Sequence, residues 1–558
     1  MSFVYPIVTA TDPAGRRNAL NEALQAGQEY LLLLPEGVTL TEEMLQAFTD
    51  AAKNAPADVA VLAARVLPWG PDWHCSPITL EADCMRLEAV LVNCMLAAAA
   101  GGFDKHLTGA AADADLCWRL RGAGCRLLYC PQIVAEDERP ENDTLENYIS
   151  EVTSAAILQA AYGKTGAGLK ALAGALRTPR HYPGVRKALA KALPAAALHT
   201  LRAGLTPAPI AALHYAMPDA PGFGPQRGRC ALPKEARAAI AAERPLVSVV
   251  IRTCSRPAPL RETLKCLYHQ TYKNFEIVIV EDGVPTAQAM VAEEFADLPI
   301  RYQSTGKNVG RGRAGNWGIE LAKGKYVAFL DDDDFYYPDF IELHLARLLT
   351  GRRPAFVISS IMAFEVDVAS RSPYVYTVKK RYPVIFDHIT LMDMCVKCRI
   401  PMTGGMFLRE LYDSCGGMRE DIDGDEDWCM WLRYWRADGR TETVADLPRA
   451  VSMFGYPADP EKAAARLAAY EIFDEQMLAD EALTFVCTAA EIESWRATVA
   501  ADCAHLARVG GLEALRTDAA KHEALPLPEA AEEPRTLSAK QINRYYWYLV
   551  KEYTKENA

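Results

Sequence analysis

Four consecutive carboxylates, Asp331 to Asp334, follow a run of five apolar residues, Tyr326 to Leu330. The run predicts a strand buried on both faces of a parallel sheet. The acids then fall at the carboxyl edge, where open α/β sheets bind ligands. Adjacent carboxylates repel one another, and Mg²⁺ or Mn²⁺ shared with substrate phosphates would relieve that repulsion. A solvated acidic turn is the alternative, but the buried strand favours the metal site.

Two apolar runs upstream predict the strands that must position these acids. Residues 247–253 and 275–280 each read as a buried strand with a polar end, and a helix is expected over residues 260–268 between them. Consecutive parallel strands of this kind form the nucleotide-binding half of an open sheet. Asp282 follows the second strand. Its carboxylate could accept hydrogen bonds from a base or a ribose, or only complete an Asp-Gly turn.

A glycine- and arginine-rich turn over residues 306–318 leads into a predicted helix that ends near Lys323. Main-chain amides at a helix start, together with Arg311 and Arg313, would suit a diphosphate. A tight connection between two elements is the alternative. The position of the turn, directly before the strand that carries the acids, favours the diphosphate.

Composition excludes several classes of protein. The chain has 558 residues and a formal net charge of −12, which argues against a nucleic-acid partner, because phosphate binding needs clustered Lys and Arg. The longest apolar tract, residues 89–103, is too short to span a bilayer, and the N-terminus lacks the pattern of a signal peptide. Fifteen scattered cysteines fit reduced thiols. We therefore expect a cytoplasmic protein without a transmembrane segment, at most peripheral at the inner face of the membrane.

The chain is expected to divide into four parts. Residues 1–140 alternate strands and helices, which indicates a parallel α/β sheet. Residues 141–243 form a helical region and a proline-rich linker. Residues 244–456 form a second α/β domain. Residues 457–558 form a helical extension, in which helices are expected over residues 461–478 and 488–507. The last helix, over residues 539–555, is rich in aromatic residues. It could dock on the second domain, pair with another subunit in a homo-oligomer, or lie on a membrane surface.

A series of short motifs runs through residues 245–455 in a fixed order. In chain order they are Ser248 to Ile251, Gln270 to Ile277, Glu281-Asp282-Gly283, Asn308-Val309-Gly310, Asn316 with Gly318, Phe329 to Asp334, Gly404 to Arg409, Gly416-Gly417-Met418 and Asp425 to Arg433. The motifs and their order resemble those of glycosyltransferase family 2. The resemblance implies the α/β GT-A fold, a Rossmann-like fold of nucleotide-diphospho-sugar transferases.

The resemblance also implies an activity. Family members transfer a sugar with inversion from a nucleotide-diphosphate sugar, here a UDP-sugar as the first expectation. The acceptor would be a hydroxyl of a glycan, a lipid-linked glycan or a protein in bacterial polysaccharide or glycoconjugate synthesis. A divalent Mn²⁺ or Mg²⁺ on an Asp-X-Asp motif bridges the diphosphate and stabilises the departing nucleotide.

The motifs carry the family's functional residues onto this chain. The metal falls on Asp331 and Asp333. Nucleotide contacts are expected from Thr253, Arg256, Asp282, Arg313 and Asp332. Acceptor contacts are expected from Thr403, Gly404, Gly405 and Glu426.

The base of a Glu-Asp pair falls on Asp427, which would take the proton of the acceptor hydroxyl. A helix N-cap is the alternative for Asp427, since residues 428–435 look helical. Trp428, Trp431 and Trp435 could stack on sugars, but their shared helix face indicates core.

The N-terminal region resembles a truncated second copy of the same fold. Placing residues 30–34 over 326–330 puts Arg17 on Arg313, and further downstream residues 101–103 match 416–418 and residues 113–119 match 427–433. The four acids become Pro35-Glu36-Gly37-Val38, and the strands before the glycine-rich turn are nearly absent. We therefore expect an inert pseudo-domain with a structural or acceptor-holding role.

Two other classes of function remain. One is a non-catalytic carbohydrate-binding or scaffold pseudoenzyme of a glycan assembly complex, although such a module would not need acids at both the metal and base positions. The other is a nucleotidyltransferase. It would place a glycine-rich, lysine-bearing loop after its first strand, and residues 253–257 are not one.

Overall fold

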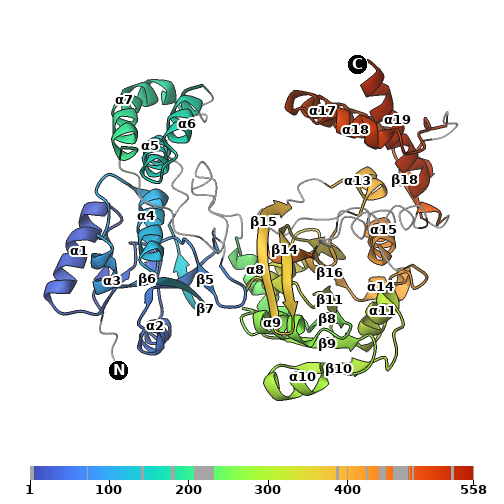
Figure 1. Ribbon diagram of the computed structural model, residues 1–558, viewed down its shortest axis with the longest axis horizontal. Helices are drawn as coiled ribbons and strands as arrows, with labels where there is room; N and C mark the ends of the chain where they lie inside the picture. The colour runs from blue at the N-terminus through green and yellow to red at the C-terminus, as the bar shows by residue number, and fades with distance from the viewer. Residues whose placement is uncertain are drawn as a thin grey trace. The chain divides into compact units, whose positions relative to one another are not determined.

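The computed structural model describes most of the chain and divides into two compact units, Met1–Ala238 and Ala239–Ala558 (Figure 1). The described residues are 5–71, 73, 75–139, 144–177, 182–205, 231–384, 389–398, 400–422, 425–438, 448–455, 476, 478–480, 483–528 and 533–556. Most of the predicted linker and nearly all of the helix expected over residues 461–478 lie outside them.

The second unit is built on a six-stranded sheet. Its elements are β8 (Val247–Thr253), β9 (Phe275–Glu281), β10 (Ile300–Ser304), β11 (Tyr326–Phe329), β13 (Phe356–Ile358) and β16 (Gly405–Leu408), in the order β10-β9-β8-β11-β16-β13. The first four strands in this order run parallel to one another, and β16 runs antiparallel to both of its neighbours, β11 and β13. Because β8 pairs with β11 in the register Val250↔Phe329, the residues that follow both strands meet at one edge.

A smaller sheet and several helices complete the region around this edge. The sheet has the order β12 (Phe335–Tyr336), β17 (Ala450–Gly455), β14 (Ile361–Arg371), β15 (Tyr374–Val384). The helices are α9 (Pro257–Leu267), α10 (Gln288–Glu294), α11 (Arg311–Leu321), α12 (Phe340–Leu349), α13 (Leu391–Val396), the 3₁₀ turn η2 (Met402–Gly404), α14 (Glu410–Cys415) and α15 (Glu426–Asp438). Helix α11 lies close against the sheet because Gly318 has no side chain: a Cβ there would meet Val250 Cγ1 at 2.3 Å.

The C-terminal part of this unit pairs β18 (Thr484–Cys487) with β19 (Arg535–Ser538), beside α17 (Ala489–Val509), α18 (Leu512–Ala519) and α19 (Ala539–Glu556) (red in Figure 1). The aromatic helix α19 packs on α17 and on α13, and Tyr545 and Trp547 are buried. Docking within the chain is therefore the arrangement seen.

The first unit holds a sheet in the order β1 (Ile7–Val8), β2 (Tyr30–Leu33), β6 (Val90–Asn93), β4 (Val59–Leu67), β7 (Arg126–Asp137), β3 (Val38–Thr39), with β5 (Glu81–Ala82) paired to β7. Its helices are α1 (Pro13–Gln25), α2 (Glu42–Asn54), α3 (Cys94–Ala99) and α4 (Gly109–Gly122). Helices α5 (Leu145–Ala161), α6 (Thr165–Arg177) and α7 (Val185–Ala203) pack on one another, and the division between the two units falls within α8 (Lys234–Glu243).

The expectation of a parallel sheet for residues 1–140 was wrong. Strands β1 and β2 are parallel, as are β4 and β7, but β6 runs antiparallel to both of its neighbours. A parallel return needs a crossover, usually a helix. The described residues between β4 and β6 contain no helix, so β6 returns in the opposite direction.

The strand directions of the two units nevertheless follow one scheme. Strand β1 is parallel to β2, which is antiparallel to β6, which is antiparallel to β4, and β8, β11, β16 and β13 repeat these directions. Strand β7 runs parallel to β4 as β17 does to β14. Among the described residues of the first unit, no strands correspond to β9 and β10. This likeness supports the interpretation of a truncated copy, which remains a prediction.

In the part of the chain that the structure describes, no helix is both long enough and apolar enough to cross a bilayer.

Candidate active site

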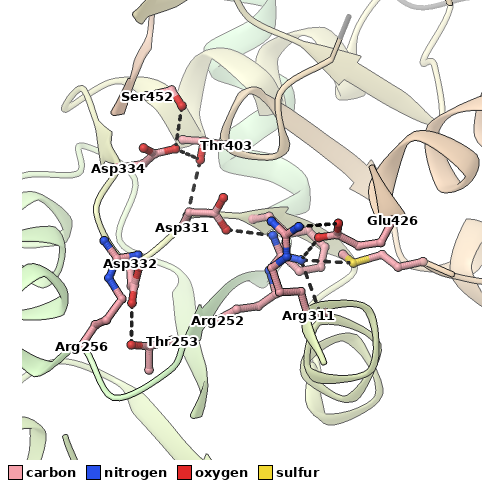
Figure 2. Close-up of polar contacts among 12 residues, drawn as sticks. Arg252, Thr253, Arg256, Arg311, Asp331, Asp332, Asp334, Thr403, Glu426 and Ser452 are labelled. Carbon is pink, nitrogen blue, oxygen red and sulfur yellow. Dashed lines mark hydrogen bonds and ion pairs between the residues drawn. The ribbon is translucent and has the colours of Figure 1, made fainter. Parts of the chain in front are cut away.

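The residues after β8 and β11 form one polar cluster at the carboxyl edge of the sheet (Figure 2). The four acids after β11 take different partners, and this separates their roles. Asp332 is 4% exposed and accepts hydrogen bonds from Thr253 Oγ1 at 2.6 Å and Arg256 Nη1 at 2.7 Å. Burial raises the pKa of Asp332 to about 7, against the lowering effect of Arg256.

Arg256 also binds the next acid, because its second terminal nitrogen donates to Asp333 Oδ2. Burial raises the pKa of Asp333 as well, and Arg256 again opposes the rise. One guanidinium group therefore serves two neighbouring carboxylates. The structure brings together four of the predicted site residues here: Thr253, Arg256, Asp332 and Asp333.

Asp334 has an internal role. Its carboxylate accepts from the hydroxyl groups of Thr403 and Ser452 (the latter at 3.1 Å) and from Met453 N at 2.8 Å. Burial holds the pKa of Asp334 well above its usual range. Asp334 thus ties the end of β11 to the smaller sheet and to η2.

The predicted acceptor loop supplies these internal contacts. The Thr403 side chain is buried with its hydroxyl committed to Asp334. Gly405 leaves room for an indole, because a Cβ there would lie 2.5 Å from Trp431. Gly404 is buried too, and its carbonyl oxygen lies 3.3 Å from His344 Nε2. The structure gives these residues packing roles, and acceptor contact stays a prediction.

Asp331 is the most exposed of the four acids and pairs with a different arginine. Its Oδ1 accepts from Arg252 Nη2 at 3.0 Å, and the other terminal nitrogen of Arg252 donates to Glu426 Oε1 at 2.6 Å. Arg311 Nη2 lies 3.8 Å from the second oxygen of Glu426. Burial alone would raise the pKa of Glu426, but Arg252 and Arg311 outweigh it and lower the pKa.

Arg252 was not among the site residues predicted from the sequence. The available signal was a charged residue near the end of an otherwise apolar strand, β8, and a basic side chain at that place can reach only the carboxyl edge. Glu426 was predicted to touch the acceptor. In the structure it is 3% exposed and forms ion pairs with Arg252 and Arg311, and acceptor contact stays a prediction.

Asp427 lies in the first turn of α15. The helix begins at Glu426, so Asp427 is not its N-cap. Burial raises the pKa of Asp427 to about 8, Glu426 adds to the rise, and Arg252 opposes it. A carboxylate with a pKa near the working pH is suited to general-base catalysis. Trp428, Trp431 and Trp435 are buried and belong to the core, as their spacing indicated.

Two predicted nucleotide residues have other partners. The carboxylate of Asp282 accepts from Val309 N at 2.6 Å and Gly310 N at 3.0 Å, and so holds the glycine-rich turn before α11. Arg313 pairs with Glu320 and Glu420. Within the described residues, its ion pairs do not include the acids after β11. Nucleotide contact by either residue stays a prediction.

The acids after β11 are candidate ligands of a divalent metal ion. Asp331, Asp332 and Asp333 follow β11 closely, so their carboxylates lie at the carboxyl edge of the sheet, and Mg²⁺ and Mn²⁺ prefer such ligands. Among the described residues, no group of three acidic, cysteine or histidine side chains is arranged to hold an ion alone. The carboxylate oxygens present therefore fit an ion that one or two of these acids share with substrate phosphates.

The chain resembles known glycosyltransferases. The family model "Glycosyl transferase family 2" matches residues 248–414. The uncharacterized glycosyltransferase YwdF of Bacillus subtilis (strain 168) is 32% identical over 189 residues, covering 34% of this chain and 67% of that protein. The putative glycosyltransferase EpsH of the same organism is 39% identical over 101 residues, or 18% of this chain and 29% of EpsH.

Part of the chain also resembles a solved structure. S. aureus TarS 1–349 in complex with UDP-GlcNAc aligns at 17% identity with a TM-score of 0.32, covering 42% of this chain and 66% of that one. The chain spans less than a third of EpsH but two thirds of YwdF. From the family model, the likeness to YwdF and the order of β8, β9, β10 and β11, the chain belongs to glycosyl transferase family 2, and its second unit carries the GT-A fold.

Proposed function

We propose that the second unit is an inverting, divalent-metal-dependent glycosyltransferase that moves a sugar from a nucleotide-diphosphate sugar to an acceptor hydroxyl. One observation carries the proposal. Two groups of acids from distant segments meet through Arg252: Asp331 after β11, and Glu426 beside Asp427 in α15. One group is suited to a diphosphate and its counter-ion, the other to a proton transfer.

The residues divide the reaction between them. Asp427 takes the proton from the acceptor hydroxyl as its oxygen attacks the anomeric carbon, from the face opposite the diphosphate. The bond from that carbon to the diphosphate oxygen breaks, and its electron pair leaves with the nucleoside diphosphate. A single displacement inverts the anomeric carbon.

The leaving diphosphate needs positive charge. Asp331 and Asp333 would hold the metal ion, which when bound neutralises charge on the departing diphosphate. Arg311 lies at the first residue of α11, where main-chain amides also point at an anion. We take a UDP-sugar as the first donor to test. Glycan, lipid-linked and protein acceptors at a cytoplasmic site are the acceptor classes to screen.

For the first unit we propose a structural role. The position that the repeat aligns with Asp427 is Asp113, and Asp113 is 3% exposed and paired with Arg16 at 2.7 Å. With so little of its side chain exposed and one oxygen held by Arg16, Asp113 is closed to a substrate hydroxyl. This supports an inert unit.

Donor binding can be tested without an acceptor. Thermal unfolding is measured with UDP, GDP, dTDP and CMP, each with and without Mn²⁺, because a bound ligand raises the melting temperature. We expect a Mn²⁺-dependent rise with one nucleotide, lost in Asp333→Ala and kept in the control Asp413→Ala, an exposed acid of α14. No rise with any nucleotide would favour the non-catalytic scaffold.

Transfer itself is tested with Asp427→Asn. The amide cannot accept the proton, so turnover should fall by about 10²–10⁴-fold while the nucleotide-induced rise is kept. Unchanged turnover would remove Asp427 from the mechanism.

A further inference from the structure

Arg252 is a buried charge near the end of an apolar strand. Its side chain is 10% exposed, and the residues before it in β8 are buried. A buried guanidinium group is stable only where its N–H groups find acceptors. Here the acceptors are Asp331 Oδ1 and Glu426 Oε1, and the group also lies over the Phe329 ring, 5.9 Å from its centroid.

These partners belong to different parts of the fold. Asp331 follows β11 on the donor side of the site, and Glu426 opens α15, one residue before Asp427. Figure 2 shows the Arg252 side chain between the two carboxylates. Arg252 Nη1 also lies 3.4 Å from the carbonyl oxygen of Arg311, at the start of α11. One planar group therefore contacts three parts of the fold that carry residues of the proposed reaction: the end of β11, the start of α11 and the start of α15.

We propose that Arg252 is a positioning residue, which ties the donor edge at Asp331 to the first turn of α15 and so aims Asp427 at the reacting centre. The inference rests on the proposed function. It assigns Arg252 no contact with substrate. Arg252 acts through Glu426, whose buried carboxylate it holds in one place.

The geometry explains why an arginine is needed. A guanidinium group presents several N–H donors in a rigid fork and can bind two carboxylates at fixed positions, whereas the ammonium group of a lysine is a single point of charge on a flexible stem. Lysine would keep the positive charge but release one of the two acids. The bridge and the charge can thus be separated by substitution.

The charge has a second effect, on Asp427. The groups that face Asp427 are Glu426, Asp425 and Asp331, which raise its pKa, and Arg252, which lowers it. The thiol of Cys398 also faces Asp427, Asp425 and Glu426, and burial keeps the pKa of that thiol well above its usual range. Without Arg252, the pKa of Asp427 should rise further.

The test compares Arg252→Met and Arg252→Lys with the wild-type protein. The control is Arg449→Lys, because Arg449 is also buried, pairs with Asp339 at 3.0 Å and lies over an aromatic ring, that of Tyr337. For each protein, kcat and the donor KM are measured from pH 6 to 10, and the melting temperature is recorded.

Arg252→Met should lower kcat by about 10²-fold, as expected for a misplaced catalytic group, with the donor KM within about threefold of wild type. The low-pH limb of its kcat profile should move up by about one pH unit. Arg252→Lys should also lower kcat but keep the limb near its wild-type position. Arg449→Lys should lower the melting temperature and leave the limb unmoved.

Three results would overturn the inference: wild-type kcat in Arg252→Lys, a loss confined to the donor KM, or an unmoved limb in Arg252→Met. If Arg252→Met does not fold, the kcat of Arg252→Lys alone decides. Failure of the proposed function is seen separately, as absence of transfer by the wild-type protein or full turnover in Asp427→Asn.

Discussion

The side-chain amide of Asn543 in α19 donates a hydrogen bond to the main-chain carbonyl of Cys395 in α13, 2.9 Å away. The neighbouring carbonyl, that of Met394, accepts from Trp428 Nε1 at 2.5 Å. Trp428 directly follows Asp427. The C-terminal helix is thus two hydrogen bonds from the helix that carries the proposed base.

Replacing Asn543 should loosen this docking. Asn543→Leu leaves the Cys395 carbonyl without this donor, and an unsatisfied buried group costs about 1–3 kcal/mol. We expect the free energy of unfolding in urea to fall by that amount. Lys540→Ala, an exposed change on the same helix, should leave it unchanged. Equal stabilities of the two variants would show that the bond contributes nothing to docking.

The pH dependence of transfer should report Asp427. Burial raises its pKa to about 8, and a base acts only when deprotonated. Turnover should therefore rise with pH through about 8 and be lost as the pH falls below it. Initial rates between pH 5.5 and 9.5 at saturating donor measure this. A profile that is flat over this range contradicts the assignment.

His344 should make the free energy of unfolding depend on pH between about 6.5 and 4. It is fully buried, and burial lowers its pKa to about 4. Below pH 6.5 the unfolded chain takes up a proton that the folded protein refuses, so His344 destabilises the fold increasingly as the pH falls from 6.5 to 4. The full effect is roughly 3 kcal/mol.

His344→Gln removes this titration. The difference in unfolding free energy between the variant and the wild-type protein should shift in favour of the variant as the pH is lowered from 7.5 to 4.5. Urea unfolding at four or five pH values measures it. A difference that does not change with pH would mean that His344 does not titrate between the two states.

The ion pair of Arg16 and Asp113 should matter for stability but not for catalysis. Arg16→Met leaves a buried carboxylate unpaired, which typically costs about 3–5 kcal/mol. We expect the first unit to melt at a lower temperature in calorimetry while kcat at 20 °C stays at the wild-type value. Arg17→Met, an exposed neighbour on α1, is the control. A loss of kcat in Arg16→Met alone would give the first unit a part in the reaction.

The sequence by itself determined the main strands of the second unit and the family of the chain. Apolar runs of strand length, each ended by polar residues, are local signals, and they correctly placed β8, β9 and β11 and put the acids after β11 at the carboxyl edge. The order of the short motifs was enough to identify the family, because it is a property of the chain and not of its packing. The sequence also predicted a helix over residues 428–435. It is the core of α15, which begins at Glu426, so Asp427 lies in its first turn.

Only the tertiary structure decided which polar groups meet. Arg252 lies 79 residues from Asp331 and 174 from Glu426 in sequence, and no local pattern pairs them. Likewise, the commitment of Asp282 to the turn before α11 and of Thr403 to Asp334 follows from how separate elements pack. The direction of β6 depended on a connection without a helix. Burial and charge pairing are properties of neighbours in space, and the fold alone assigns those neighbours.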